Sequence, residues 1–256
     1  MTPTPADALV QPPPGRRERN RRQRERAYLD AAMEIAGRDG IRNLTMVRLA
    51  DQVDAAVGTV YTYFPSKGAL IAELQREAIE RLTASYHLVR DRSEAALADW
   101  DDPAAAAVAR LAVFGRFWVA SVDTLPQEAA FMHALISESE ETVPPEEHHR
   151  VLPAALTLLD EARSAVVTAA GLGAIEVDDP MDVVIRWAAA LTGVLLTSNL
   201  APLNPVAFDG RRLATVLQRD LLLGWGAPRA LVERAEEHVA QLAAAGPLAP
   251  PAAEPA

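Results

Sequence analysis

Residues 45–67 bring together side chains that can bind a polyanion such as a nucleic acid. Thr59, Tyr61 and Tyr63 carry hydroxyl groups and Lys67 an ammonium group, and each can donate to a phosphate oxygen. Small and methyl-bearing side chains between them can meet base edges in a groove. We predict DNA contacts at two sets of residues: Thr45, Thr59, Tyr61, Tyr63 and Lys67 on phosphates, and Val47, Arg48, Val57, Gly58 and Thr62 on bases.

The same segment contains the signals for two short helices and a turn. Thr45 can cap the first helix, because its hydroxyl can accept from free amides of the first turn. Asp54 follows that helix, and Asp tolerates a left-handed conformation better than most residues. The second helix is expected at residues 57–63, and Pro65 ends it. This spacing predicts a helix-turn-helix, whose second helix can enter a major groove.

A simpler interpretation of these residues is that they only fold the segment. Val60 and Phe64 should anchor the second helix in a core, and the tyrosines could pack there too. Gly58, however, needs a reason, because a glycine inside a helix costs about 1 kcal/mol relative to alanine. Close approach of the backbone to DNA is one such reason.

The segment resembles the DNA-binding domain of the TetR family of transcriptional regulators. The matching residues are Leu29, Ala31, Ala32, Gly40, Thr45, Leu49, Ala50, Gly58, Thr59, Val60, Tyr61, Phe64 and Lys67, within roughly the first quarter of the chain. The resemblance implies a homodimer, an all-helical ligand-binding body, and release from DNA when a small molecule binds. Asp54 and Ala56 depart from the family pattern, and Ala56 is a poor helix cap.

Composition limits the other classes of protein. The 256 residues are rich in Ala and poor in aromatic residues, which favours helices over strands. The absence of Cys excludes disulfides and thiolate sites. No secretory signal and no uninterrupted apolar run of membrane-spanning length is evident, since polar residues interrupt the stretch 187–203. A cytoplasmic, soluble protein is expected.

The net charge of −10 is unevenly distributed. Residues 1–80 hold 12 Lys and Arg against 11 Asp and Glu, whereas residues 81–256 hold 13 against 24. Seven Arg lie between Arg16 and Arg26. This arginine-rich segment either reaches DNA or is a solvated tail that adds positive potential; the sequence leaves both open.

The expected fold is all-α, with about ten helices. The domains we predict are a disordered leader at 1–15, a helix-turn-helix domain at 16–70, a helical ligand-binding and dimerisation domain at 71–245, and a disordered tail at 246–256. In the body, six helices are expected near residues 102–123, 126–138, 146–171, 180–200, 208–224 and 228–245, because loop signals separate these stretches.

Two body helices are apolar nearly all round and could line a ligand cavity. The candidate ligand-binding residues are Phe114, Phe117, Trp118, Phe131, Met132, Trp187 and Leu191. Each of these could equally fill a core, and the cavity rests on the family resemblance. Arg116, His133 and Arg186 are the polar residues that could meet an acidic group on a ligand.

Small residues recur at four-residue spacing on one predicted helix, where another helix could approach closely. We predict a dimer interface formed as a four-helix bundle across a two-fold, involving Ala189, Gly193, Thr197, Leu213, Leu217 and Leu221. An intramolecular contact with the same packing is the alternative.

No other chemistry stands out. Residues 146–149, Glu-Glu-His-His, lack the spacing of a metal site, and residues 171–173 lack the context of a phosphate loop. We therefore expect no enzyme, no metal and no cofactor. The sequence predicts a dimeric repressor that binds a palindromic DNA operator and responds to a small, largely apolar effector. The alternative is an apolar-ligand carrier whose helix-turn-helix does not bind DNA.

Overall fold

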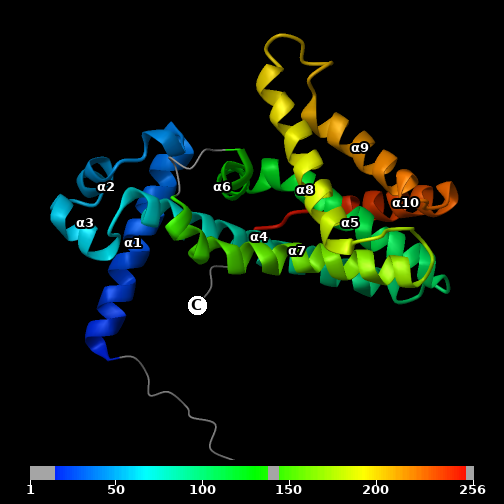
Figure 1. Cartoon of the computed structure of the whole chain (residues 1–256), viewed down its shortest axis with the longest axis horizontal. Coiled ribbons are helices and arrows are strands. Elements are labelled where there is room, and N and C mark those ends of the chain that lie inside the picture. Colours follow the sequence, from blue (N-terminus) through cyan, green and yellow to red (C-terminus); the bar gives the residue numbers. More distant parts are fainter. Residues whose placement is uncertain (1–14, 138–143, 252–256) are drawn as a thin grey trace, which may run out of the picture. The chain divides into compact units, whose positions relative to one another are not determined.

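The computed structural model describes residues 15–137 and 144–251, and these form an all-helical protein. They contain ten α-helices, three short 3-10 helices and no β-strand, which confirms the predicted fold class (Figure 1). The predicted leader lies outside the described residues except for Gly15. The chain divides into two compact units, Met1–Lys67 and Gly68–Ala256.

The first unit holds three α-helices around a small core. They are α1 (Arg16–Asp39), α2 (Met46–Gln52) and α3 (Val57–Tyr63), with a 3-10 turn η1 (Ile41–Asn43) between the first two. Apolar residues at helical spacing on α1 face this core. The buried residues of the unit include Leu29, Ala32, Ile35, Leu49, Ala50 and Val60.

Local chemistry fixes the bounds of α2 and α3. The Thr45 hydroxyl accepts from the Arg48 amide at 3.2 Å, as predicted for a helix cap. Asp54 has a φ of 50°, so it adopts the left-handed conformation that the turn requires. Ala56 makes no side-chain cap, because its methyl group cannot accept a hydrogen bond.

The second unit contains seven long helices. These are α4 (Lys67–Leu97), whose first residue is the last of the first unit, α5 (Pro103–Thr124), α6 (Pro126–Ser137), α7 (His148–Gly171), α8 (Pro180–Leu196), α9 (Gly210–Gly224) and α10 (Arg229–Ala245). Short 3-10 helices η2 (Pro145–Glu147) and η3 (Thr197–Leu200) precede α7 and follow α8. Helix α5 is buried along most of its length and contacts α6, α7, α8, α9 and α10.

The observed ends of the body helices differ from the predicted ones by a few residues. The Asp209 carboxylate accepts from the Arg212 amide at 3.1 Å, so α9 begins at Gly210 and not at Phe208. The predicted helix 180–200 changes to 3-10 geometry after Leu196, and the predicted start at Glu146 is a 3-10 turn. Ends are the least certain part of a helix, because they lack partners for their backbone groups.

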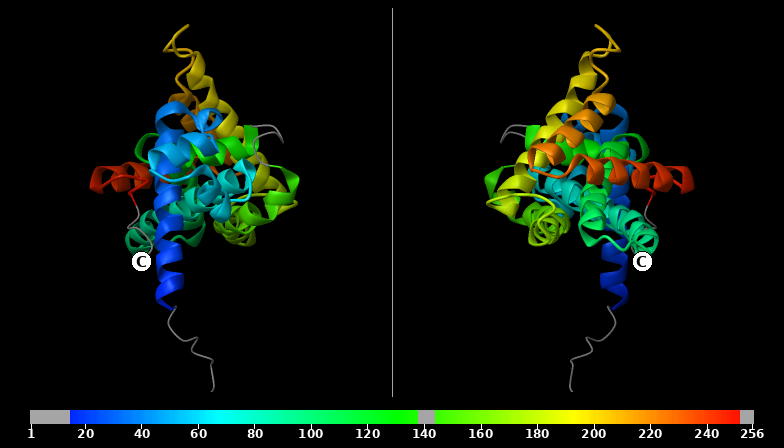
Figure 2. Two further views of the ribbon diagram at one scale, coloured as in Figure 1. Left: turned by 90° about the vertical axis from the view of Figure 1, so that its left-hand side faces the viewer. Right: turned by 90° about the vertical axis from the view of Figure 1, so that its right-hand side faces the viewer.

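Helices α8 and α9 form an antiparallel hairpin. They lie side by side, and the turn between them projects from the rest of the second unit in every view (Figures 1 and 2). Leu200, Leu203 and Val206 are exposed at this tip.

The predicted disorder of residues 246–256 is wrong for the part that the structure describes. Arg92 of α4 donates to the Pro247 carbonyl at 2.9 Å, and Ser85 donates to the Pro250 carbonyl at 2.6 Å. Leu248 and Ala249 are buried between these bonds. A Pro- and Ala-rich segment loses little side-chain entropy on ordering, so two buried apolar residues and two hydrogen bonds can hold it.

The expectation of no apolar stretch of membrane-spanning length was too strict. By length and composition alone, helix α5 and the stretch Pro180–Leu200 are long and apolar enough to cross a membrane. The apolar window of α5 is 78% buried within the protein, which is typical of a core helix.

Candidate nucleic-acid interface and ligand cavity

Helix α3 presents a solvent-facing side whose residues are small, hydroxylated or aromatic. Val60 and Phe64 are buried and anchor the helix, as predicted, whereas Gly58, Tyr61 and Thr62 are exposed. Nothing lies within 4 Å of the position that a Cβ on Gly58 would occupy. The interior of the unit therefore gives no packing reason for a glycine here, and its solvent side is open to close approach.

Among the described residues of the first unit, two large apolar side chains are exposed, and both belong to the helix-turn-helix. Val47 of α2 is 55% exposed and Tyr61 of α3 is 48% exposed. Single exposed apolar residues are common on protein surfaces. Here both are among the residues predicted to contact DNA, one on each helix of the motif.

Three of the candidate DNA-contacting residues, Tyr63, Lys67 and Thr62, have partners inside the unit. The Tyr63 ring packs edge-on against Tyr28 with centroids 5.0 Å apart, so Tyr63 both packs and exposes part of its surface. Lys67 Nζ donates to the Arg42 carbonyl at 3.2 Å, and Thr62 Oγ1 donates to the Gly58 carbonyl at 3.1 Å. Thr45 is exposed, and Val57 and Thr59 are half-buried.

Asp39 forms an ion pair with Arg48, and the sequence did not predict this pairing. The Arg48 guanidinium donates to the Asp39 carboxylate and to the Asn43 carbonyl, the latter at 3.0 Å. Hydrogen bonding from Arg38, and then from Arg48, lowers the pKa of Asp39. Arg48 must therefore leave a carboxylate before it can contact a base.

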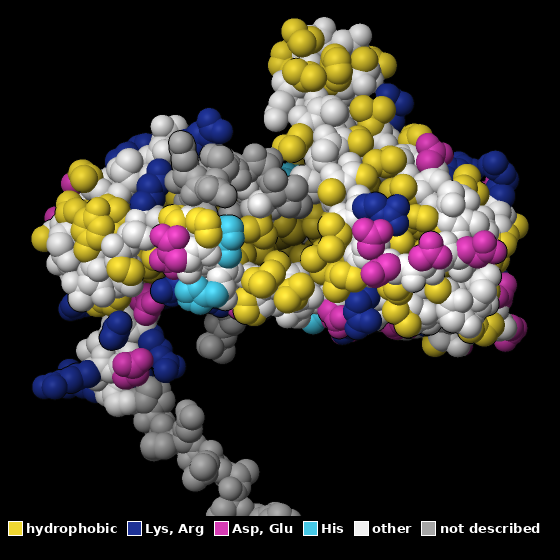
Figure 3. All heavy atoms as spheres, viewed as in Figure 1, with side chains coloured by type: hydrophobic (Ala, Val, Ile, Leu, Met, Phe, Trp, Pro, Cys, Tyr) yellow, Lys and Arg dark blue, Asp and Glu magenta, His cyan; other side chains and the backbone are white. Residues whose placement is uncertain are grey.

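The arginine-rich segment forms the first turns of α1. Arg16, Arg17, Arg21 and Arg24 are exposed there, and basic side chains surround this part of the helix in Figure 3. Arg22 pairs with Glu18 at 3.2 Å. The segment is therefore helical, rather than an extended arm or an unstructured tail.

The comparisons with known proteins agree with this geometry. Residues 29–74 match the family model described as bacterial regulatory proteins of the tetR family. The transcriptional repressor KstR of Mycobacterium tuberculosis is 41% identical over 63 residues, and KstR of Rhodococcus jostii is 36% identical over 61 residues.

The amino-terminal domain is thus similar to the tetR family of bacterial regulatory proteins, and we call it the TetR domain below. The matched segments cover 25% and 24% of this chain and 29% of each KstR protein. The chain thus spans less than a third of the length of the curated relatives that it matches.

Solved structures extend the likeness of fold to the body that follows the TetR domain. The match to RolR in complex with resorcinol covers 85% of this chain and 95% of the RolR chain, with a TM-score of 0.54 and 17% identity. A protein from Saccharomonospora viridis in complex with choline covers 75% of this chain and 94% of its own, with a TM-score of 0.53 and 20% identity. At these identities the likeness shows the fold.

The second unit contains an apolar cavity of about 190 Å³. Side chains from α4, α5, α6, α7 and α8 form its wall, among them Ile79, Trp118, Met132, Leu158, Ile185 and Ala189. Trp118 is buried, and its indole Nε1 has no hydrogen-bond partner among the described residues. A buried donor without an acceptor costs free energy, about 1–3 kcal/mol.

Two of the seven predicted ligand-binding residues, Trp118 and Met132, line this cavity. The other five are buried but do not line it: Phe114, Phe117, Phe131, Trp187 and Leu191. Phe114 instead packs against Trp187, with ring centroids 5.4 Å apart, and against Tyr86 at 5.0 Å. An apolar helix predicts that a residue is buried, but not whether it faces a cavity or a neighbouring ring.

The three polar candidates lie outside the wall of the apolar cavity. Arg186 is exposed and pairs with Asp182 at 2.8 Å. His133 is half-buried, and burial lowers its pKa. Arg116 lines a different cavity, between α5, α9 and α10.

The residues predicted for a dimer interface lie on the α8–α9 hairpin. Ala189 and Gly193 are exposed, whereas Thr197, Leu213, Leu217 and Leu221 are half-buried. Two large apolar neighbours, Ile185 and Val216, are also exposed, at 52% and 47%. Ala189 also borders the apolar cavity.

Proposed function

We propose that the chain is a cytoplasmic transcriptional repressor that binds a palindromic DNA operator as a homodimer. A small, largely apolar effector releases it from the operator. The observation that carries this proposal is the open side of α3, where Gly58, Tyr61 and Thr62 face solvent. Sequence identity to a KstR repressor extends over 63 residues, 25% of this chain.

On the operator, α3 would enter the major groove, and α2 would cross the backbone. Thr45, Thr59, Tyr61, Tyr63 and Lys67 would then position the domain on phosphates. Val57 and Thr62 suit thymine methyl groups, because both carry methyls at the exposed side or edge of the helix. Two half-sites related by a two-fold would be separated by one helical turn of DNA or more.

The effector site of this proposal is the apolar cavity between α4 and α8. RolR binds resorcinol and the Saccharomonospora viridis protein binds choline, so bodies of this fold hold small molecules. Here the wall is almost entirely apolar. The effector of this proposal is therefore a largely apolar molecule.

The homodimer of this proposal uses the α8–α9 hairpin. Its exposed apolar residues include Ile185, Val216 and, at the tip, Leu203. A hairpin that pairs with its copy buries such residues in a four-helix bundle. A dimeric mass in light scattering at micromolar concentration is expected, and a monomeric mass would contradict this part of the proposal.

The test of DNA binding is a titration of the protein with the DNA that flanks its own gene, at two salt concentrations. Saturable binding to one palindrome is expected. Tyr61→Ala weakens it, and Lys67→Met also lowers the slope of log affinity against log salt by about 1, because one phosphate contact is lost.

Arg163→Met is the matched control, because Arg163 lies on α7 in the second unit and pairs with Asp160 at 2.6 Å. It should leave operator affinity unchanged. Weak binding that is indifferent to DNA sequence and to Tyr61 and Lys67 would instead favour an apolar-ligand carrier.

A further inference from the structure

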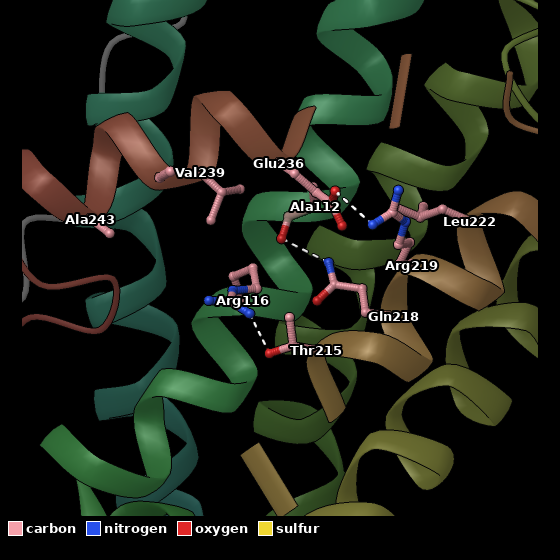
Figure 4. A pocket seen from close by; sticks show the side chains of 10 residues that line it. Ala112, Arg116, Thr215, Gln218, Arg219, Leu222, Glu236, Val239 and Ala243 are labelled. Atoms are coloured by element: carbon pink, nitrogen blue, oxygen red, sulfur yellow. Dashed lines mark hydrogen bonds and ion pairs between the residues drawn. The ribbon is translucent and has the colours of Figure 1, made fainter. Parts of the chain in front are cut away.

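A second cavity of about 180 Å³ lies between α5, α9 and α10 (Figure 4). It shares no wall residue with the apolar cavity. One part of its wall is apolar and includes Leu222 of α9 and Val239 of α10. The other part holds charged and polar groups, namely Arg116, Gln218, Arg219 and Glu236.

Arg116 is a cation in the wall of this cavity without an acidic partner. It belongs to α5, a helix that is otherwise almost entirely apolar and buried. Its guanidinium donates to the Thr215 hydroxyl, and no carboxylate among the described residues lies within ion-pair distance of it. Glu236, the acid of the cavity, lies 3.5 Å from Arg219 instead. Burial lowers the pKa of Arg116, which is the effect of removing a cation from water.

Gln218 offers a fixed acceptor beside Arg116. Its amide nitrogen donates to the Ala112 carbonyl at 2.8 Å, and the residue is only 3% exposed. Its Oε1 has no partner among the described residues, and Figure 4 shows this oxygen on the side of the amide that faces Arg116. Protein interiors rarely leave such an acceptor unpaired.

The position of Gln218 depends on a glycine of α5. A Cβ on Gly115 would lie 2.4 Å from the Gln218 side-chain carbon, so a larger residue at position 115 would displace the amide. The two helices thus approach closely at this point, and the cavity combines a fixed acceptor, a cation and an apolar wall.

We propose that this cavity binds a small organic acid with an apolar body and a hydroxyl group. Its carboxylate pairs with Arg116, its hydroxyl donates to Gln218 Oε1, and its apolar body packs against Leu222 and Val239. Two arginines against one glutamate leave a net positive charge for an anion. The volume suits a single ring, because a cavity of about 150 Å³ holds benzene. The site is separate from the effector site proposed above and does not rest on DNA binding.

The test uses the full chain without DNA and 3-hydroxybenzoate as the probe, with binding followed by calorimetry. Wild-type protein should bind 3-hydroxybenzoate at least about tenfold more tightly than 3-hydroxybenzyl alcohol, which lacks the carboxylate. Benzoate, which lacks the hydroxyl group, should bind more weakly than 3-hydroxybenzoate. This comparison needs no variant.

Variants then locate the site. Arg116→Met should weaken 3-hydroxybenzoate binding at least about tenfold, and Arg186→Met, at an exposed arginine of α8, should leave it unchanged. The proposal is overturned if the acid binds no better than the alcohol, if Arg116→Met binds it as wild type does, or if no binding occurs at millimolar probe. Operator binding that fails while this test succeeds would overturn only the proposed repressor function.

Discussion

The TetR domain and the helical body place their candidate functional residues in opposite environments. In the domain, Gly58 and Tyr61 face solvent, and the core lies behind them. In the body, Trp118 and Arg116 line cavities among buried helices. The candidate recognition residues are therefore separate from the core residues in the domain, but they lie next to core residues in the body. Substitutions should separate binding from stability in the first region and couple them in the second.

The largest expected effect is on the stability of the body. Phe114→Ala removes a ring from the centre of an aromatic cluster and should lower the free energy of unfolding by about 3–5 kcal/mol. Tyr61→Ala should change it by no more than about 0.5 kcal/mol while weakening operator binding. Urea unfolding of both variants tests the contrast, which fails if Tyr61→Ala destabilises the protein as strongly as Phe114→Ala.

A pair of glycines gives the next largest effect. Gly115→Ala should destabilise the body by about 1–3 kcal/mol, because its Cβ meets the buried Gln218. Gly58→Ala meets open space and should stabilise α3 by up to about 1 kcal/mol while it weakens operator binding. Unfolding midpoints and DNA titrations of the two variants are the measurements. A Gly58→Ala protein with full operator affinity would show that the backbone at position 58 does not approach DNA.

The pairing of Asp39 with Arg48 predicts a smaller effect, and in the opposite direction. Asp39→Asn frees Arg48 and removes a negative charge from a surface that would face phosphates. Operator affinity should rise by roughly two- to fivefold at low salt and less at high salt. Asp160→Asn, at an exposed acid of α7, is the control and should leave affinity unchanged. A fall in affinity with Asp39→Asn would mean that Asp39 orients Arg48 for binding.

The smallest expected effect is a pH dependence confined to the body. Burial lowers the pKa of both His133 and His238, and all five histidines of the chain lie beyond residue 86. In the native body these rings bind protons less readily than in the unfolded chain. The body should therefore lose stability as pH falls through about 6.5, the ordinary pKa of His.

Urea unfolding at about pH 7.5 and about pH 5.5 measures this loss, and His238→Asn should reduce it. The TetR domain contains no His. Operator affinity, measured at the same two pH values, is therefore the reference for the part of the protein that should not respond. An unfolding midpoint that does not move between the two pH values would contradict the prediction.

The sequence predicted the TetR domain more closely than the body because the signals of the domain are local. Thr45, Asp54 and Pro65 each act on backbone within a few residues, and the structure has the cap and the turn where they predict them. The pairing of Asp39 with Arg48 joins residues on either side of a 3-10 turn. No helical periodicity could have predicted it.

In the body, the sequence predicted burial but not geometry. The apolar pattern of α5 places Phe114 and Trp118 alike inside the protein, although only Trp118 lines the apolar cavity. Gln218 and Gly115 meet across two helices far apart in the chain, and neither carries a motif. The burial of Leu248 and Ala249 could not be predicted, because they lie in a Pro- and Ala-rich segment and such a composition alone indicates disorder.

The segment that contains Leu248 and Ala249 also has a consequence for the order of synthesis. It covers part of α4 through Ser85 and Arg92, so the first helix of the body is completed by residues made more than 150 positions later. A ribosome adds about 5–20 residues per second. During that interval α4 has its side chains but lacks this cover. A chain stopped before residue 247 would leave this part of α4 uncovered permanently, which would make it a target for chaperones and proteases.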